Sequence, residues 1–222
     1  MNGPLISLIN GLASGDLALI LSALIILALL LGVAFPVHEL AHAVTARYLG
    51  DDTSERLGRI TLNPLAHLDP WGSLLFALTG FGWAKPVPVN TYLLRGDPQW
   101  SFAFVALAGP LSNLVLAALF ALSFRLLDAL AGPDLFVANI IRIVLLIAVQ
   151  LNVSLALFNL IPVSPLDGSR LLAALLPAQG QAWMDQLERY GFLILFALAA
   201  TGLLGQLIAE PASLLSRAML GL

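Results

Sequence analysis

The sequence predicts an all-α polytopic membrane protein with about four spanning helices, a short re-entrant or interfacial segment and a small membrane-associated β element. Of its 222 residues, 59% are hydrophobic and only 10% are charged, whereas a soluble domain carries about 25% charged residues. The mean hydropathy is +0.94, and the apolar residues gather in long runs. This composition excludes an ordinary soluble enzyme, and the lack of a basic patch argues against a nucleic-acid partner.

Four apolar runs are long enough to cross a membrane, because about 20 residues of helix span the hydrocarbon core. The first run continues as helix to Gly50, with Asp16 as its N-cap and a kink expected at Pro36. We expect the spanning helices over residues 17–37, 102–127, 136–160 and 192–208. Together they predict a single membrane-embedded domain over residues 1–222.

Three shorter segments differ from these spans. Residues 71–81 are apolar but too short to cross, so we expect a re-entrant or interfacial segment there. Residues 59–62 alternate in polarity and residues 87–90 follow prolines, so both are expected to be extended and to form the β element. Two prolines between Asn159 and Gly168 exclude a continuous helix in that stretch.

The basic side chains predict which side of the membrane the loops face. Alternating the spans places seven of the ten Lys and Arg residues on one side. Because cytoplasmic loops are enriched in Lys and Arg, that side is predicted to be cytoplasmic. We therefore expect a multi-pass protein of the cell membrane whose functional residues lie nearer the cytoplasmic side. The seven residues are Arg47, Arg56, Arg59, Lys85, Arg95, Arg170 and Arg189.

The strongest motif is His38-Glu-Leu-Ala-His42. Residues four apart share one helix face, so both imidazoles can bind one metal ion while Glu39 reaches a water molecule beside it. The motif lies among apolar residues, where an unpaired ionisable group costs at least ~2.5 kcal/mol. The alternative is a helix end that emerges into the interface with satisfied polar side chains. The motif favours a metal site.

A catalytic zinc site usually has three protein ligands and one open position. The chain has no cysteine, so the candidates for the third ligand are His67, Asp69 and Asp167. Asp167 follows the break in a spanning segment, beside Gly168, where a carboxylate is best explained by a cation opposite it. The spacing leaves one alternative open, in which Asp167 caps a helix that begins near Ser169.

Three motifs occur together in this chain: His38-Glu-Leu-Ala-His42, Gly109-Pro110-x-x-Asn113 and Asn159-x-x-Pro162-x-x-Pro165-Leu-Asp167-Gly168. Together they resemble the site-2 protease family of intramembrane zinc metalloproteases, over residues 17–205. Residues 58–70 and 82–90 resemble the short prokaryotic branch, and no inserted PDZ-like or appended nucleotide-sensing domain is expected. Ser169 stands where the family often has a second glycine.

The resemblance implies one Zn²⁺ per chain, held by His38, His42 and Asp167, with Glu39 as the general base. It implies a zinc metalloendopeptidase that hydrolyses peptide bonds within or near transmembrane segments. The expected partners are therefore transmembrane protein substrates and the lipid bilayer. The alternative is a non-hydrolytic zinc-binding scaffold or a metal transporter. Glu39 argues against it, because a transporter needs several weak sites along a path and no base.

The candidate substrate-binding residues are Asn113, His67 and Asn159. A substrate helix must unwind before cleavage, and its orphan amide groups could pair with the edge of residues 59–62 or 87–90 and with Asn113. The resemblance supports this role for Asn113, whose alternative is an interhelical hydrogen bond. Three roles stay open for His67: a fourth metal ligand, a transition-state donor, or a loop residue bonded to nearby backbone.

Overall fold

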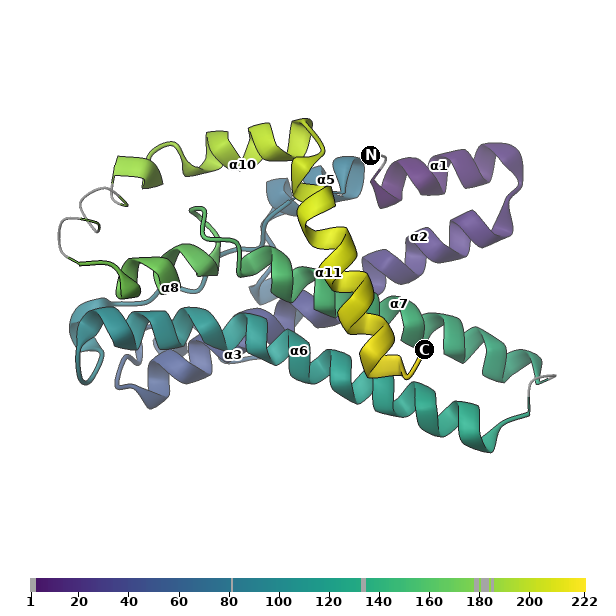
Figure 1. Ribbon diagram of the computed structural model, residues 1–222, viewed down its shortest axis with the longest axis horizontal. Helices are drawn as coiled ribbons and strands as arrows, with labels where there is room; N and C mark the ends of the chain where they lie inside the picture. Colours follow the sequence, from purple (N-terminus) through teal and green to yellow (C-terminus); the bar gives the residue numbers. More distant parts are fainter. Residues whose placement is uncertain (1–2, 81, 133–134, 178–179, 181–183, 185) are drawn as a thin grey trace.

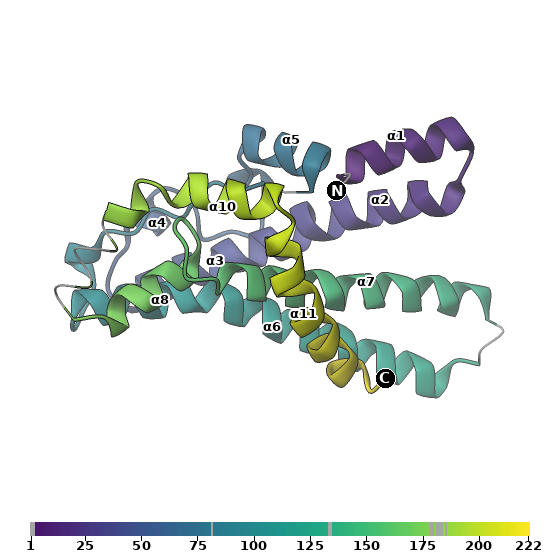
Figure 2. The same cartoon turned by 45° about the horizontal axis from the view of Figure 1, so that its top comes forward.

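Two long antiparallel helices form the centre of the molecule (Figure 1). They are α6 (Pro98–Leu130) and α7 (Phe136–Asn159), and both match predicted spans. The computed structural model describes residues 3–80, 82–132, 135–177, 180, 184 and 186–222. Some of the other helices pack against this pair, and others pack only against neighbouring helices farther from it (Figure 2).

The first predicted span is one continuous helical stretch, Leu17–Tyr48. Asp16 caps it, as predicted, by accepting a hydrogen bond from the amide of Leu19 at 3.1 Å. A proline has no N–H to offer the helix, and the wider π-helical turn immediately before Pro36 is the local adjustment at the predicted kink. The three parts of this stretch are α2 (Leu17–Leu29), η1 (Leu30–Ala34) and α3 (Phe35–Tyr48).

The fourth predicted span differs from the structure, because it is bent rather than continuous. It consists of α10 (Gly191–Ala200) and α11 (Leu203–Leu220), which meet at 77°. Gly202 makes the bend possible with a φ of 76°, which a residue with a Cβ rarely adopts. By length and composition the described chain has three helices that can cross a membrane, or four if the bent pair is one span. It is a multi-pass membrane protein.

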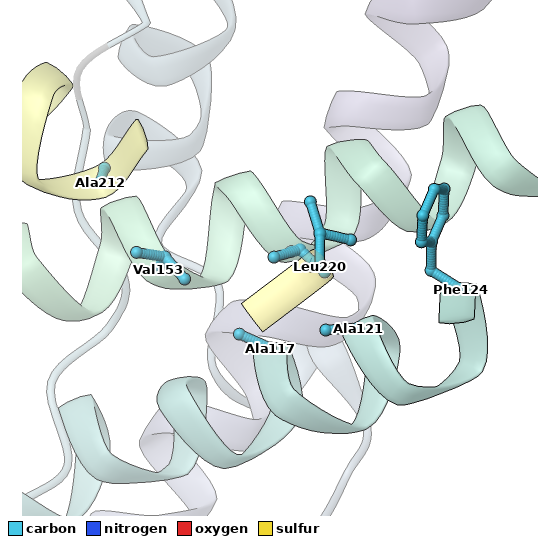
Figure 3. Close-up of a cluster of buried hydrophobic side chains, with 7 residues drawn as sticks. Ala117, Ala121, Phe124, Val153, Ala212 and Leu220 are labelled. Atoms are coloured by element: carbon cyan, nitrogen blue, oxygen red, sulfur yellow. The ribbon is translucent and has the colours of Figure 1, made fainter. Parts of the chain in front are cut away.

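α11 crosses α6 and α7 through small side chains (Figures 1 and 3). Helices in lipid gain little from water exclusion, so close packing decides their association, and alanine lets backbones approach. This cluster occupies the C-terminal part of α6, and we call it the apolar half of the α6–α7 pair. Its buried members are Ala117, Ala121, Phe124, Val149, Val153, Ala212 and Leu220.

Two short helices meet end to end. α5 (Pro70–Thr79) has ten residues, about 15 Å of helix, which is half of the hydrocarbon core and agrees with a segment too short to cross. Phe81, the end of the predicted segment, lies outside the described residues. The sequence analysis did not predict α1 (Pro4–Ser14). The Gly3 amide before α1 donates to the carbonyl of Leu78 at 3.0 Å, which joins α1 to the end of α5.

The predicted β element is not formed as strands within the described residues. One isolated antiparallel bridge pairs Leu68 with Ala84, and the amide of Lys85 donates to the carbonyl of His67 at 2.8 Å. The remaining short helices border this region or follow it. They are α4 (Thr53–Arg56), η2 (Pro64–Ala66), η3 (Thr91–Leu93) and α8 (Asp167–Leu175).

Candidate metal centre

Three side chains from two separate helices converge between α3, α6 and α8. His38 and His42 lie one turn apart on α3, and the break after α7 brings α8 back so that Asp167 faces them. The Nε2 atoms of His38 and His42 lie 3.2 Å and 3.4 Å from Oδ2 of Asp167. These three residues form a group able to hold a metal ion, with ligand atoms within 4.8 Å of one another.

Asp167 does not act as a helix cap. It is the first residue of α8, whose N-cap position is Leu166, and no side-chain capping bond is made there. Oδ2 of Asp167 instead faces the two imidazoles, the position expected of a third metal ligand.

The hydrogen bonds around His38 fix which of its nitrogens carries a proton. Asn152 donates to the carbonyl of Ala148, so its Oδ1 accepts from Asn113 at 3.1 Å. Asn113 also donates to the carbonyl of Ala34, so its Oδ1 must accept from Nδ1 of His38, 2.6 Å away. The neutral imidazole then presents a lone pair on Nε2.

His42 reaches the same state through one backbone contact. Its Nδ1 lies 2.7 Å from the carbonyl of Val105, which can only accept. Two Nε2 lone pairs and one carboxylate oxygen thus converge, and Oδ2 of Asp167 is buried without a hydrogen-bond donor among the described residues. Such an arrangement is stable around a cation. A tetrahedral zinc site with ligands at ~2.1 Å needs ~3.4 Å between ligand atoms, close to the 3.2 Å and 3.4 Å between Oδ2 of Asp167 and the two Nε2 atoms.

Gly109 allows α6 to pass directly beside the two imidazoles. A Cβ at this position would lie 2.4 Å from Nε2 of His42 and 2.6 Å from Cε1 of His38. Any side chain at this position would therefore displace the imidazoles or the helix. This close approach explains the glycine in the Gly109-Pro110-x-x-Asn113 motif.

Glu39 lines the same cavity as the three candidate ligands. This cavity has a volume of about 1050 Å³ and reaches from α3 to α11. Its walls are mostly apolar, and they include Phe35, Phe76 and Phe192 besides the polar residues. The Glu39 side chain is buried, so the arrangement places a carboxylate beside a metal site at the wall of a large apolar chamber.

The predicted substrate-binding residues occupy three different places. Both N–H groups of Asn113 are used within the protein, so the structure places it behind His38 as an orienting partner. Asn159 lines the cavity, and its amide donates to the carbonyl of Leu155 at 3.0 Å. His67 is outside the metal group and fully buried, with Nε2 2.7 Å from the carbonyl of Thr61.

The sequence analysis missed Asn152, which accepts from Asn113 behind His38, and the carbonyl of Val105, which bonds to His42. Asn152 is a polar residue in an otherwise apolar predicted span, and such residues are expensive in lipid and usually functional. The presence of an asparagine in this apolar span could have identified Asn152 as a candidate functional residue. A backbone carbonyl such as that of Val105 leaves no signal in a sequence. The Asp69 side chain, the other rejected ligand candidate, caps α5 by accepting from the amide of Gly72 at 2.8 Å.

Two imidazoles and one carboxylate, oriented by buried hydrogen bonds between membrane-spanning helices, define a membrane protein with a metal centre of the zinc-hydrolase type. Comparisons with known proteins agree. The family model described as Peptidase family M50 matches residues 26–131 and 128–201. The chain belongs to this family, which is the site-2 protease family of intramembrane zinc metalloproteases, and its metal is zinc.

Curated relatives carry names of the same kind. The chain is 43% identical over 192 residues to "Putative zinc metalloprotease YwhC" of Bacillus subtilis, covering 82% of this chain and 84% of that protein. It is 33% identical over 181 residues to "Putative zinc metalloprotease Rip2" of Mycolicibacterium smegmatis, covering 78% and 66%. No solved structure matches the chain. These names give no support to the transporter or scaffold alternative.

Proposed function

We propose that this chain is a single membrane-embedded domain over residues 1–222 that cleaves other membrane proteins within or near their transmembrane segments. It acts in the cell membrane, with its metal centre nearer the cytoplasmic side, as the distribution of Lys and Arg favours. One observation carries the proposal. The metal-binding atoms of His38, His42 and Asp167 converge at the wall of a large apolar cavity that Glu39 also lines.

Each residue of the centre has an assigned role. Bound by His38, His42 and Asp167, zinc supplies Lewis-acid polarisation of the scissile carbonyl and lowers the pKa of water at the site towards ~7. Glu39 is the general base, which takes a proton from that water and donates it to the leaving amine. Asn113 and Asn152 hold the tautomer of His38 in which Nε2 can bind metal.

The substrate is proposed to lie as an extended strand along residues 87–90. A helix hides its peptide bonds in internal hydrogen bonds, so an unwound substrate needs new partners for its backbone. Val87 and Val89 line the cavity, and their backbone groups have no hydrogen-bond partner within the described part of the chain. Pairing with this edge would complete the predicted β element, and we propose that Asn159, which also lines the cavity, contacts the same substrate.

The general-base role is tested with Glu39→Gln, which keeps the shape of the side chain and removes its basicity. We expect the variant to retain zinc and to cleave a helix-destabilised single-pass substrate ~10²–10⁴-fold more slowly. Glu210→Gln makes the same chemical change on an exposed residue of α11 and should leave the rate unchanged. Cleavage by Glu39→Gln at the wild-type rate would refute the assignment.

The ligand set is tested by zinc content per chain after extensive dialysis. We expect near-stoichiometric zinc in wild type, little in Asp167→Ala, and wild-type content in His67→Ala, whose imidazole lies outside the metal group. Wild type without zinc, or Asp167→Ala with as much zinc as wild type, would show that the proposed centre is wrong.

A further inference from the structure

Residues 84–90, which we call the strap, run along the wall of the cavity. Ala84, Pro86, Val87 and Val89 all line it. The strap belongs to no helix. Backbone contacts hold its start at Ala84 and Lys85, and beyond them its position depends on side chains from elsewhere in the chain.

Three buried polar side chains between the end of α3 and residue 59 form hydrogen bonds to four backbone atoms of the strap. Oδ2 of Asp51 accepts from the amide of Asn90 at 2.7 Å. The Ser54 hydroxyl donates to the carbonyl of Pro88 at 2.6 Å. The side chains of these two residues are fully buried.

Arg59 provides the other two contacts. Its guanidinium donates to the carbonyl of Pro86 at 3.0 Å and to the carbonyl of Lys85 at 2.5 Å. The Arg59 side chain is only 5% exposed, and a buried charge is costly unless its donors are used. Burial lowers the pKa of Arg59, and the Glu39 carboxylate opposes that change, so the guanidinium lies within electrostatic range of the proposed base.

Among residues 86–90 these contacts fall on one edge of the strap. At Lys85, which alternation places on the opposite edge, His67 and Arg59 already use both backbone groups. In an extended segment, alternate residues present their backbone groups to opposite edges. The backbone of residues 86, 88 and 90 is hydrogen-bonded to these side chains, whereas the backbone groups of residues 87 and 89 have no hydrogen-bond partner within the described chain. Pro86 and Pro88 lack an N–H, so the hydrogen-bonded edge leaves no donor unsatisfied at these positions. The free edge is therefore the edge formed by Val87 and Val89.

We propose that Asp51, Ser54 and Arg59 are positioning residues that hold the strap so that its Val87–Val89 edge pairs with the unwound substrate. This inference rests on the proposed function. The three side chains touch neither the metal group nor the predicted substrate, and they act through the strap. Loosening the strap should weaken substrate binding and leave zinc binding intact.

The kinetic test compares Ser54→Ala and Arg59→Gln with wild type on one transmembrane substrate. Loss of one buried hydrogen bond is expected to raise KM about 5–30-fold, with kcat changed less than about two-fold and zinc content unchanged. Ser54→Thr and Arg59→Lys retain a donor and should recover part of the loss. Ser123→Ala removes a hydroxyl that bonds only to its own helix, and its KM should equal that of wild type.

Hydrogen exchange tests the same inference without turnover. In Glu39→Gln, added substrate should slow exchange at the amides of Val87 and Val89, and Ser54→Ala in that background should weaken this protection. Retained zinc with unchanged KM in Ser54→Ala and Arg59→Gln, and unchanged protection in Ser54→Ala, would overturn the inference while leaving the protease assignment intact. A wild-type chain that neither binds zinc nor cleaves would overturn the proposed function, and the inference with it.

Discussion

The two halves of the α6–α7 pair are built from opposite kinds of residue. The half at the metal centre buries Asn113 and Asn152 in a hydrogen-bonded network that ends on His38. The other half buries Ala117, Ala121 and their apolar neighbours (Figure 3). The apolar cluster packs the same two helices through apolar side chains, so helix packing does not by itself call for a buried amide network. The presence of Asn113 and Asn152 is explained by their hydrogen-bonded connection to His38.

The largest expected effect on zinc binding comes from Gly109→Ala, which places a methyl group beside the two histidines, in the half of the α6–α7 pair at the metal centre. Its Cβ would lie 2.4 Å from Nε2 of His42, and a displaced imidazole cannot bind the metal with His38 and Asp167. We expect zinc content to fall to less than about one tenth of wild type and cleavage to be lost, since ligand geometry sets the affinity. Zinc per chain and substrate cleavage measure this.

Gly32→Ala is the matched control, because a Cβ at Gly32 has open space around it. This variant should keep zinc and activity. If Gly109→Ala also binds stoichiometric zinc, α6 does not approach the histidines as closely as described, and the contrast between the two halves loses its strongest support.

A smaller effect is expected from Asn152→Leu, which removes an acceptor two steps away from the metal. Asn113 would lose the partner of one N–H, so its hold on the His38 tautomer would weaken. Loss of such an outer partner typically lowers metal affinity 10–100-fold. Competition with a chelator should show this change, together with a stability loss of about 1–3 kcal/mol from the unpaired N–H of Asn113. A stability loss without any change in zinc affinity would instead make Asn152 a packing residue.

Ala121→Leu tests the opposite half of the pair. Ala121 is 2% exposed, and overpacking a tight contact typically costs about 1–3 kcal/mol. We expect a lower unfolding temperature in detergent with unchanged zinc content. Leu122→Ala is the control, since Leu122 is exposed on the same helix and should change stability little. Zinc loss in Ala121→Leu at temperatures where the protein stays folded would mean that the two halves are coupled.

The same contrast explains which features could be predicted from the sequence. Three spans and the break before Asp167 were predicted correctly, because long apolar runs and prolines act locally. The family was also predicted correctly, because His38, Glu39 and His42 form a motif whose spacing has a direct chemical meaning.

Features that depend on tertiary contacts were not predictable. The bend at Gly202 was missed because a glycine within an apolar run does not by itself indicate a break. The hydrogen bonds from Ser54 and Arg59 to the strap join residues 26–34 positions apart in the sequence. The periodicity of apolar residues gives no information about such distant pairs. The orientation of His38 likewise depends on an asparagine 75 residues away.

The smallest expected effect is on the pH dependence of stability. It should be seen for Asp51, near the metal centre, and not for Asp128, at the far end of the α6–α7 pair. At the end near the metal centre, burial would raise the pKa of the Asp51 carboxyl, but hydrogen bonds from Thr53 and from the amide of Asn90 lower it overall. The unfolded chain then binds the proton more tightly, with a pKa of ~3.9. The stabilisation by ionised Asp51 is fully present above that value and is lost as pH falls through the lower folded pKa.

The other end carries Asp128, whose carboxylate pairs with Arg142 at 3.1 Å and is 62% exposed. The Arg142 side chain of this pair is only 12% exposed. Because the Asp128 carboxylate itself lies mostly in solvent, we expect the pair to contribute about 0–1 kcal/mol, so Asp128→Asn should change stability little at any pH. For Asp51→Asn, the stability difference from wild type should be constant near neutral pH and shrink as the medium becomes more acidic than pH ~3.9. Comparing each variant with wild type at every pH cancels the acid sensitivity of the metal ligands. If the stability difference between Asp51→Asn and wild type stays constant through this range, the negative charge of Asp51 does not strengthen its hydrogen bond to the strap. A neutral acceptor of the same shape would then be sufficient.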